Sequence, residues 1–228
     1  MKNRAANYLA LFFIVMLPLL ILPLLTSCSG LLSKQPLQTT TYYSLEMVEP
    51  KSQAKPVLNT NARLPTLVIQ PPKAAAGFDS RRMMYTRYTH QLEYFAKNEW
   101  VDTPAHMLQT LLVSAIEETG HFNAVLPKYS SVKSELSLES EIVRLIQIFN
   151  SKPSQVQFNL KVIMIDNATG QVVAQREFSE KVNAASDDPI GGVAAANQAV
   201  NAVLVKMSAF TREATIAWHK SMEIKLVK

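Results

Sequence analysis

The chain contains little cysteine and little glycine. Cys28 is the single cysteine in 228 residues, so no disulfide can form within the chain and burial of apolar surface has to stabilise the fold. The six glycines are dispersed, and none of them precedes a lysine. A phosphate-binding P-loop needs a glycine-rich turn followed by Gly-Lys-Ser/Thr. The sequence therefore argues against ATP binding through this motif.

Motifs of catalysis and metal binding are also missing. No G-x-S-x-G sequence surrounds a serine, and no two histidines form an H-x-x-x-H pair, although zinc sites usually combine closely spaced ligands. The histidines are His90, His106, His121 and His219. Asp187-Asp188 has acid–base chemistry as one interpretation, but Asp188 also suits a helix cap. We predict no metal, no cofactor and no enzymatic activity.

Positive charge is in small excess. The chain has 23 Lys and Arg against 18 Asp and Glu, which gives a formal net charge of +5. Two of the basic residues, Lys2 and Arg4, lie in the first 27 residues, so 21 basic and 18 acidic residues remain beyond them. This remaining charge is small and scattered, and it predicts no nucleic-acid partner.

The first 27 residues have the three parts of a signal peptide. A basic start is followed by an uncharged apolar run over residues 9–25 and then by small residues. The alternative is a permanent membrane helix, which needs about 20 apolar residues and is interrupted here by Pro18 and Pro23.

The signal ends in Leu25-Thr26-Ser27-Cys28, which looks like a bacterial lipobox. In such signals the cysteine is acylated and becomes the first mature residue; the alternative is a cysteine present by chance. By the same resemblance, Ser29 in place of an aspartate favours the outer membrane over the inner one. We predict a protein held at the outer membrane, facing the periplasm, by lipid on Cys28.

Turn signals and apolar patterns divide the rest of the chain into strands and two helices. Strands are predicted at residues 41–45, 64–69, 81–87, 91–95, 122–126, 136–149, 156–164 and 172–182, and Pro71-Pro72 ends the second of them. Apolar residues alternate along 156–164, and a turn at 166–170 joins this strand to the last one as a hairpin. Thr103-Pro104 and Asp188-Pro189 each combine a capping residue with a proline suited to the first helical turn. The first helix is expected to end at Gly120 and the second before His219.

This order indicates an α+β fold: a single domain with a largely antiparallel sheet packed by two main helices. We expect a lipoprotein signal peptide at residues 1–27, a lipidated flexible tether at 28–41, the domain at 42–219 and a polar tail at 220–228. The apolar alternation within 136–149 shifts phase near Ser140, which predicts a bulge or burial on both faces.

The run from residue 81 to 88 is the most unusual local segment. Arg, Met and Tyr are enriched in the cores of interfaces, so five of its side chains are candidates for binding a partner. They are Arg81, Arg82, Met84, Tyr85 and Arg87. The alternative is an ordinary strand with Met83 and Tyr85 buried and the arginines solvated. Gly191-Gly192, in the first turn of the last helix, suits either an anion site or close packing, and packing is favoured.

Five segments together carry a family resemblance. They are the lipobox at Cys28, Tyr42-Tyr43-Ser44-Leu45, Phe78-Asp79-Ser80-Arg81-Arg82-Met83-Met84-Tyr85, Trp100-Val101-Asp102-Thr103-Pro104 and Asp166-Asn167-Ala168-Thr169-Gly170-Gln171-Val172-Val173-Ala174. In this order, from about Thr41 to Phe210, the chain resembles the ABC-type transport auxiliary lipoprotein family, which includes paraquat-inducible protein C.

The resemblance implies a non-enzymatic subunit of an ABC-linked system. Its partners would be a periplasmic MCE-domain protein, a permease and an ATPase, and its cargo phospholipid or another hydrophobic molecule. A second hypothesis is a periplasmic lipoprotein that itself binds a hydrophobic ligand in a pocket lined by both helices and the sheet. A third is a hydrolase with a dispersed site. A homo-oligomer is compatible with each of them.

Overall fold

The computed structural model describes residues 39–47, 64–128 and 132–226. The described residues belong, except for Thr39, to one compact unit, Thr40–Lys228. The predicted signal peptide, Cys28 and most of the predicted tether therefore lie outside the described residues. No helix in the described ranges combines the length and apolarity needed to span a bilayer.

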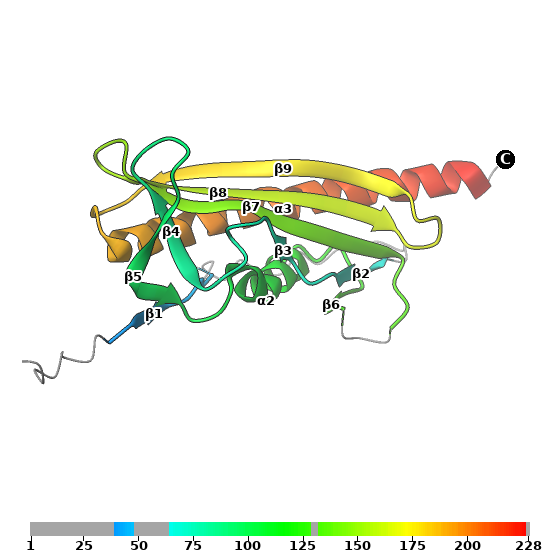
Figure 1. The fold of residues 1–228 in the computed structure, drawn as a ribbon. Helices are drawn as coiled ribbons and strands as arrows, with labels where there is room; N and C mark the ends of the chain where they lie inside the picture. Colours follow the sequence, from blue (N-terminus) through cyan, green and yellow to red (C-terminus); the bar gives the residue numbers. More distant parts are fainter. Residues whose placement is uncertain (1–38, 48–63, 129–131, 227–228) are drawn as a thin grey trace, which may run out of the picture. The chain divides into compact units, whose positions relative to one another are not determined.

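The described residues contain one mixed sheet of nine strands and two helices, which confirms the α+β class (Figure 1). One path through the sheet runs β1-β5-β4-β7-β2-β6; β3 and β8 also pair with β7, and β9 pairs with β8. The strands are β1 (Thr41–Tyr43), β2 (Thr66–Ile69), β3 (Lys73–Ala74), β4 (Arg82–Thr86), β5 (Glu93–Trp100), β6 (Ala124–Pro127), β7 (Leu136–Ile148), β8 (Gln155–Asp166) and β9 (Val172–Asn183).

The three longest strands, β7, β8 and β9, pair antiparallel. The hairpin turn that joins β8 to β9 lies at residues 166–170, as predicted. Gly170 in this turn has a φ of 68°, a conformation that residues with a side chain rarely adopt. Along β8 every second residue from Val156 to Met164 is buried, as alternation predicted. The irregularity predicted near Ser140 is a shift of register between Ile142 and Arg144.

The short N-terminal strands pair differently. β2, β3 and β4 each lie parallel to β7, and β1 lies parallel to β5. The predicted largely antiparallel sheet is thus antiparallel in its long strands and in the β4–β5 pair, and parallel elsewhere. The β3 strand was not predicted, because Pro71-Pro72 indicated the end of the preceding strand. β5 continues to Trp100, beyond the predicted end at residue 95.

Both helices begin at their predicted caps. Helix α2 (Pro104–Glu117) follows Thr103, whose Oγ1 accepts a hydrogen bond from the His106 amide at 3.3 Å. Helix α3 (Pro189–Leu226) follows Asp188, whose Oδ1 accepts one from the Gly191 amide at 2.8 Å. Each cap satisfies an amide that has no partner within its helix.

Helix α3 is longer than predicted. The expected end before His219 is wrong, because the helix continues to Leu226 and takes in most of the segment expected to be a polar tail. The Trp218 indole N–H donates to Asp166 Oδ2 at 3.0 Å, which ties this end of α3 to the end of β8. A tertiary contact of this kind stabilises helical turns whose own sequence shows no apolar periodicity.

The core lies between the sheet and the helices. Helix α3 packs against β8 and β9, and α2 packs against α3 and the short strands β2, β3 and β6. The fully buried side chains on β8 include Phe158, Leu160 and Met164. Gly192 lies against Gln147 of β7, where a Cβ atom would overlap the Gln147 amide group. A Cβ atom at Gly191 would likewise overlap the backbone of Ser186, so the packing interpretation is confirmed for both glycines.

The contact between Asp166 and Trp218 predicts a loss of stability in acid. The hydrogen bond from Trp218, with others from the amides of Ala168 and Thr169, lowers the pKa of Asp166 below its usual 3.8. Because the folded state favours the ionised carboxylate, the contact stabilises the fold at pH values above the pKa of Asp166 in the unfolded chain. This stabilisation is lost as the pH falls through the lower pKa that Asp166 has in the folded protein. We expect Asp166→Asn to reduce the fall in Tm between about pH 5 and pH 2.

Thermal unfolding followed by circular dichroism measures this dependence. Trp218→Phe removes the main donor, so it should reduce the dependence in the same direction. Asp187 and Asp188 also have lowered pKa values, because each accepts hydrogen bonds from backbone amides. Asp187 and Asp188 therefore contribute the same acid sensitivity to the parent protein and to both variants. Identical pH profiles for Asp166→Asn and the parent protein would contradict the prediction.

Candidate functional site

The predicted partner-binding residues lie on and beside β4, and they divide into two groups. Tyr85 is buried and Met84 is half-buried, whereas Arg81, Arg82 and Arg87 are exposed. The exposures match the alternative interpretation of this run, a strand with buried Met83 and Tyr85. The three arginines remain available to a partner.

The Tyr85 side chain packs among aromatic rings on the inner side of β4. Its ring lies 4.5 Å from that of Phe95 and 5.7 Å from that of Phe149, measured between centroids. Its hydroxyl donates to Glu93 Oε2 at 2.8 Å, and this hydrogen bond raises the pKa of Tyr85 above 10.0. Arg87 lies over the same ring at 5.2 Å and donates to the hydroxyl at 3.4 Å. Tyr85 thus positions Arg87 and is itself only 8% exposed.

Arg81 and Arg82 form a surface with Tyr42 and Tyr94, which were not among the predicted partner-binding residues. The Arg81 guanidinium lies 5.1 Å from the ring centroid of Tyr42, and that of Arg82 lies 4.4 Å from Tyr94. Tyr42 is 54% exposed and Tyr94 50% exposed. We call these four residues the arginine–tyrosine surface. A cation stacked on an exposed ring is held in place while its N–H groups stay open to a partner.

The arginine–tyrosine surface is assembled by strand pairing. Tyr42 of β1 lies opposite Glu99 of β5, and Glu99 lies opposite Arg82 of β4. Arg81 adds a hydrogen bond from Nε to the Trp100 carbonyl at 3.1 Å and an exposed ion pair with Glu99 at 3.9 Å. Only the parallel pairing of β1 with β5 brings Tyr42 here, and no local sequence signal predicts that pairing.

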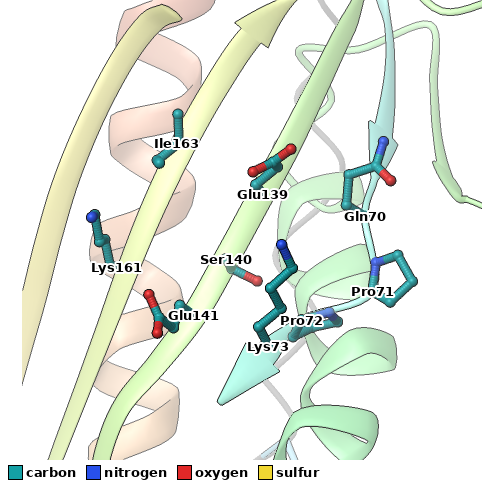
Figure 2. Close-up of a pocket in the computed structure, with 9 residues that line it drawn as sticks. All are labelled: Gln70, Pro71, Pro72, Lys73, Glu139, Ser140, Glu141, Lys161 and Ile163. Carbon is teal, nitrogen blue, oxygen red and sulfur yellow. The ribbon is translucent and has the colours of Figure 1, made fainter. Parts of the chain in front are cut away.

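A second feature is a pocket of about 380 Å³ on the face of β7 and β8 beside β3 (Figure 2). Pro71-Pro72 form one wall, and Lys73, Glu139 and Lys161 contribute charged side chains. Ser140 also lines it, and the buried hydroxyl of this residue has no hydrogen-bond partner among the described residues. We call this cavity the proline pocket. Sequence reasoning missed it, because Pro71-Pro72 were interpreted only as the end of a strand.

Two further cavities bear on ligand binding. One of about 490 Å³ lies beside the β4–β5 loop, where Leu92, Ile148 and Phe78 contribute apolar side chains and Arg87 and Arg144 contribute cations. Another of about 260 Å³ lies between α2 and α3 with Met47 at its edge, and no strand contributes to it. It therefore differs from the expected pocket lined by both helices and the sheet.

The histidines lie on separate segments of the chain: His90 between β4 and β5, His106 on α2, His121 after α2 and His219 on α3. His106 contacts the Asp102 carboxylate at the start of α2, and this hydrogen bond lowers the pKa of Asp102. Burial lowers the pKa of His121. No group of three or more His, Cys, Asp or Glu side chains that could hold a metal ion occurs among the residues described.

Comparison with known proteins identifies the family. Residues 43–208 match the family described as ABC-type transport auxiliary lipoprotein component. The chain belongs to this family. The resemblance seen in the five sequence segments is therefore confirmed, and as an ABC-type transport auxiliary lipoprotein the protein is a component of an ABC-linked transport system. No curated protein matches the sequence.

Solved structures share the fold of this auxiliary lipoprotein. Protein XCC0632 from Xanthomonas campestris is 21% identical with a TM-score of 0.67, over 79% of this chain and 99% of that one. An uncharacterized protein is 14% identical with a TM-score of 0.56, over 77% of this chain and 97% of that one. At these identities the likeness concerns the fold alone.

Proposed function

We propose that the protein is a non-enzymatic auxiliary subunit of an ABC/MCE-type system that transports phospholipid or another hydrophobic molecule across the periplasm. Membership of the auxiliary lipoprotein family over residues 43–208 carries this proposal. The lipobox ending at Cys28 supports an anchor in the membrane, and Ser29 supports the outer membrane. The domain would act by binding an MCE-domain protein, which in turn connects it to the permease and the ATPase.

Recovery of partners from the membrane tests the proposal. The full chain, with Cys28 intact, is crosslinked mildly in cells and purified through a C-terminal tag. We expect an MCE-domain protein to be recovered, together with the permease or the ATPase. Recovery of none of these components, from cells in which they are present, would count decisively against the proposal.

The arginine–tyrosine surface is the docking site we propose for the MCE partner. Tyr and Arg are enriched among the residues that dominate binding energy at interfaces, and here the rings already hold the cations in place. Two exposed arginines favour a partner surface that carries acidic groups. The surface includes β1, the first strand of the folded unit, so it also lies where the predicted tether enters the domain.

Reversing charge at this surface should weaken docking. We expect Arg82→Glu to reduce recovery of the MCE partner about tenfold, since both the attraction and the stacking on Tyr94 are lost. Quantitative mass spectrometry of the crosslinked material measures the change. Lys181→Glu, an equal charge reversal at an exposed position of β9, is the matched control. Equal recovery of the MCE partner with the two variants would show that the docking site lies elsewhere on the protein.

The second candidate function is direct binding of a hydrophobic ligand. The cavity beside the β4–β5 loop favours it, because its apolar side chains stand beside Arg87 and Arg144, which suits an anionic amphiphile. Native mass spectrometry of the protein purified in mild detergent would detect co-purified lipid. A protein that carries lipid without any MCE partner would favour this candidate over the first.

A further inference from the structure

The proline pocket exists because the chain leaves the sheet between β2 and β3. The Gln70 amide donates to the Leu138 carbonyl at 2.9 Å, and the Ala75 amide donates to the Ile142 carbonyl at the same distance. Between these bonds the first segment advances five residues and β7 only four, so one residue is in excess. Pro71 and Pro72 have no amide hydrogen to pair with β7. The segment therefore bows outward and leaves a cavity.

The Ser140 hydroxyl is an unpaired polar group at the base of this cavity. Ser140 is 6% exposed, and its Oγ atom has no hydrogen-bond partner in the described part of the chain. Figure 2 shows the hydroxyl pointing from β7 toward the segment of Pro72 and Lys73. A buried hydroxyl without a partner is unfavourable, so this position favours a polar ligand that completes its hydrogen bond.

The charges around the cavity are balanced and unpaired. Lys73 extends from β3 along the cavity, Glu139 stands on β7, and Glu141 lies opposite Lys161 of β8 in the strand register (Figure 2). The ion pairs formed among described residues, at a limit of 4.0 Å, involve none of these four side chains. Two cations and two anions around one cavity suit a ligand that carries both charges.

The lining also distinguishes between kinds of cationic group. Carboxylates accept hydrogen bonds from the three N–H groups of a primary ammonium, whereas quaternary ammonium groups are bound by aromatic cages. Apart from the four charged residues, the lining consists of Gln70, Pro71, Pro72, Ser140 and Ile163, so it contains no aromatic ring. Lysine ammonium groups bind phosphate as point charges. A volume of about 380 Å³ is near the lower end for small-molecule sites.

We propose that the proline pocket binds a phosphoethanolamine group, with Lys73 and Lys161 on the phosphodiester, Glu139 and Glu141 on the ammonium and Ser140 on a phosphate oxygen. The same group occurs in the headgroup of a membrane phospholipid and in a soluble glycerophosphodiester. The phospholipid source rests on the proposed transport function. The chemistry of the pocket does not depend on it.

Calorimetry of the mature, lipidated full chain in detergent micelles tests the proposal. The probe is soluble glycerophosphoethanolamine, and glycerophosphocholine is the comparison. We expect the ethanolamine compound to bind and the choline compound to bind at least fivefold more weakly. Lys73→Gln and Glu139→Gln should each weaken binding about tenfold, the usual effect of one charged hydrogen bond. The exposed residues Lys97 and Glu117 provide matched controls, Lys97→Gln and Glu117→Gln, which should bind as the parent does.

Ser140→Ala keeps the test independent of folding. Its hydroxyl has no partner to lose, so the variant should retain the parent Tm and still bind severalfold more weakly. Absence of binding at millimolar probe, equal binding of the two probes, or equal weakening in the control variants would each overturn the proposal. A cavity filled only by water would give the first of these results.

A competition arm separates the two sources. Micelles doped with phosphatidylethanolamine should displace the soluble probe if the headgroup of a membrane lipid is the ligand, whereas micelles doped with phosphatidylcholine should not. Binding of the soluble probe without displacement by the lipid would assign the pocket to the free diester. Failure to recover an MCE partner would count against the transport function and leave this binding result unaffected, so the two failures are distinguishable.

Discussion

Replacing Cys28 by serine is expected to release the protein from the membrane and to abolish transport. Acylation needs the thiol, and each buried CH₂ of an acyl chain contributes about 0.8 kcal/mol. One chain holds only marginally, whereas the two or three chains that lipobox proteins carry anchor durably. The folded unit begins at Thr40, so Cys28→Ser should leave its circular dichroism spectrum and Tm unchanged.

Cell fractionation and a transport assay measure the two effects together. Ser29→Ala is the matched control, because it changes the neighbouring residue, keeps the thiol and should leave the protein in the membrane fraction. A Cys28→Ser protein that is soluble and still supports full transport would show that the anchor is incidental. A Cys28→Ser protein that stays in the membrane would show that another segment provides the anchor.

Adding one methyl group at Gly192 is expected to destabilise the domain by about 2–3 kcal/mol. Gly→Ala within a helix normally stabilises by up to about 1 kcal/mol, so the expected effect has the opposite sign. A Cβ at this position would overlap the amide oxygen of the buried Gln147 and lie 2.7 Å from its Cδ. Gln147 would have to move, although its Nε2 donates to Ser154 Oγ at 2.9 Å and to the Asp188 carbonyl at 3.2 Å.

Removing the opposing side chain provides the control. Gln147→Ala loses its own hydrogen bonds but leaves room for the new methyl group. In that background Gly192→Ala should cost little or should stabilise the protein, and a double-mutant cycle by urea unfolding isolates the coupling. Equal costs of Gly192→Ala in both backgrounds would show that the close approach to Gln147 is not the cause.

Features whose signals are local were predictable from the sequence. The caps at Thr103 and Asp188, each followed by proline, mark where α2 and α3 begin. The hairpin of β8 and β9 follows from alternation on both sides of a turn that contains Gly170. In each case the residues that determine the structure lie within a few positions of one another.

Features that depend on distant pairing were not predictable. The end of α3 is stabilised by the contact between Trp218 and Asp166. These two residues lie in separate elements, α3 and β8. The two-residue strand β3 acquires strand geometry by pairing with Glu141 and Ile142 of β7, not from its own sequence. The same holds for the proline pocket, which requires the register of β2 and β3 on β7.

The candidate site divides in the same way. Arg81, Arg82 and Arg87 were identified because arginine is enriched at interfaces, and the structure places all three at the surface. Tyr85 was included for its residue type, yet strand alternation places its side chain in the interior. The alternative interpretation, a strand with Met83 and Tyr85 buried, had expected this. Tyr42 and Tyr94 were omitted, because their positions over Arg81 and Arg82 arise from the pairing of β1, β5 and β4.

The parallel pairing of the early strands with β7 also orders events in time. Leu67 pairs with Leu136 and Tyr85 with Gln147, so each early strand must wait until the chain beyond residue 136 is present. Closing loops of this length is slow compared with forming the β8–β9 hairpin, whose strands are joined by a short turn. In a chain exported with its N-terminus leading, Cys28 would therefore become available for acylation before the residues that complete the domain had emerged.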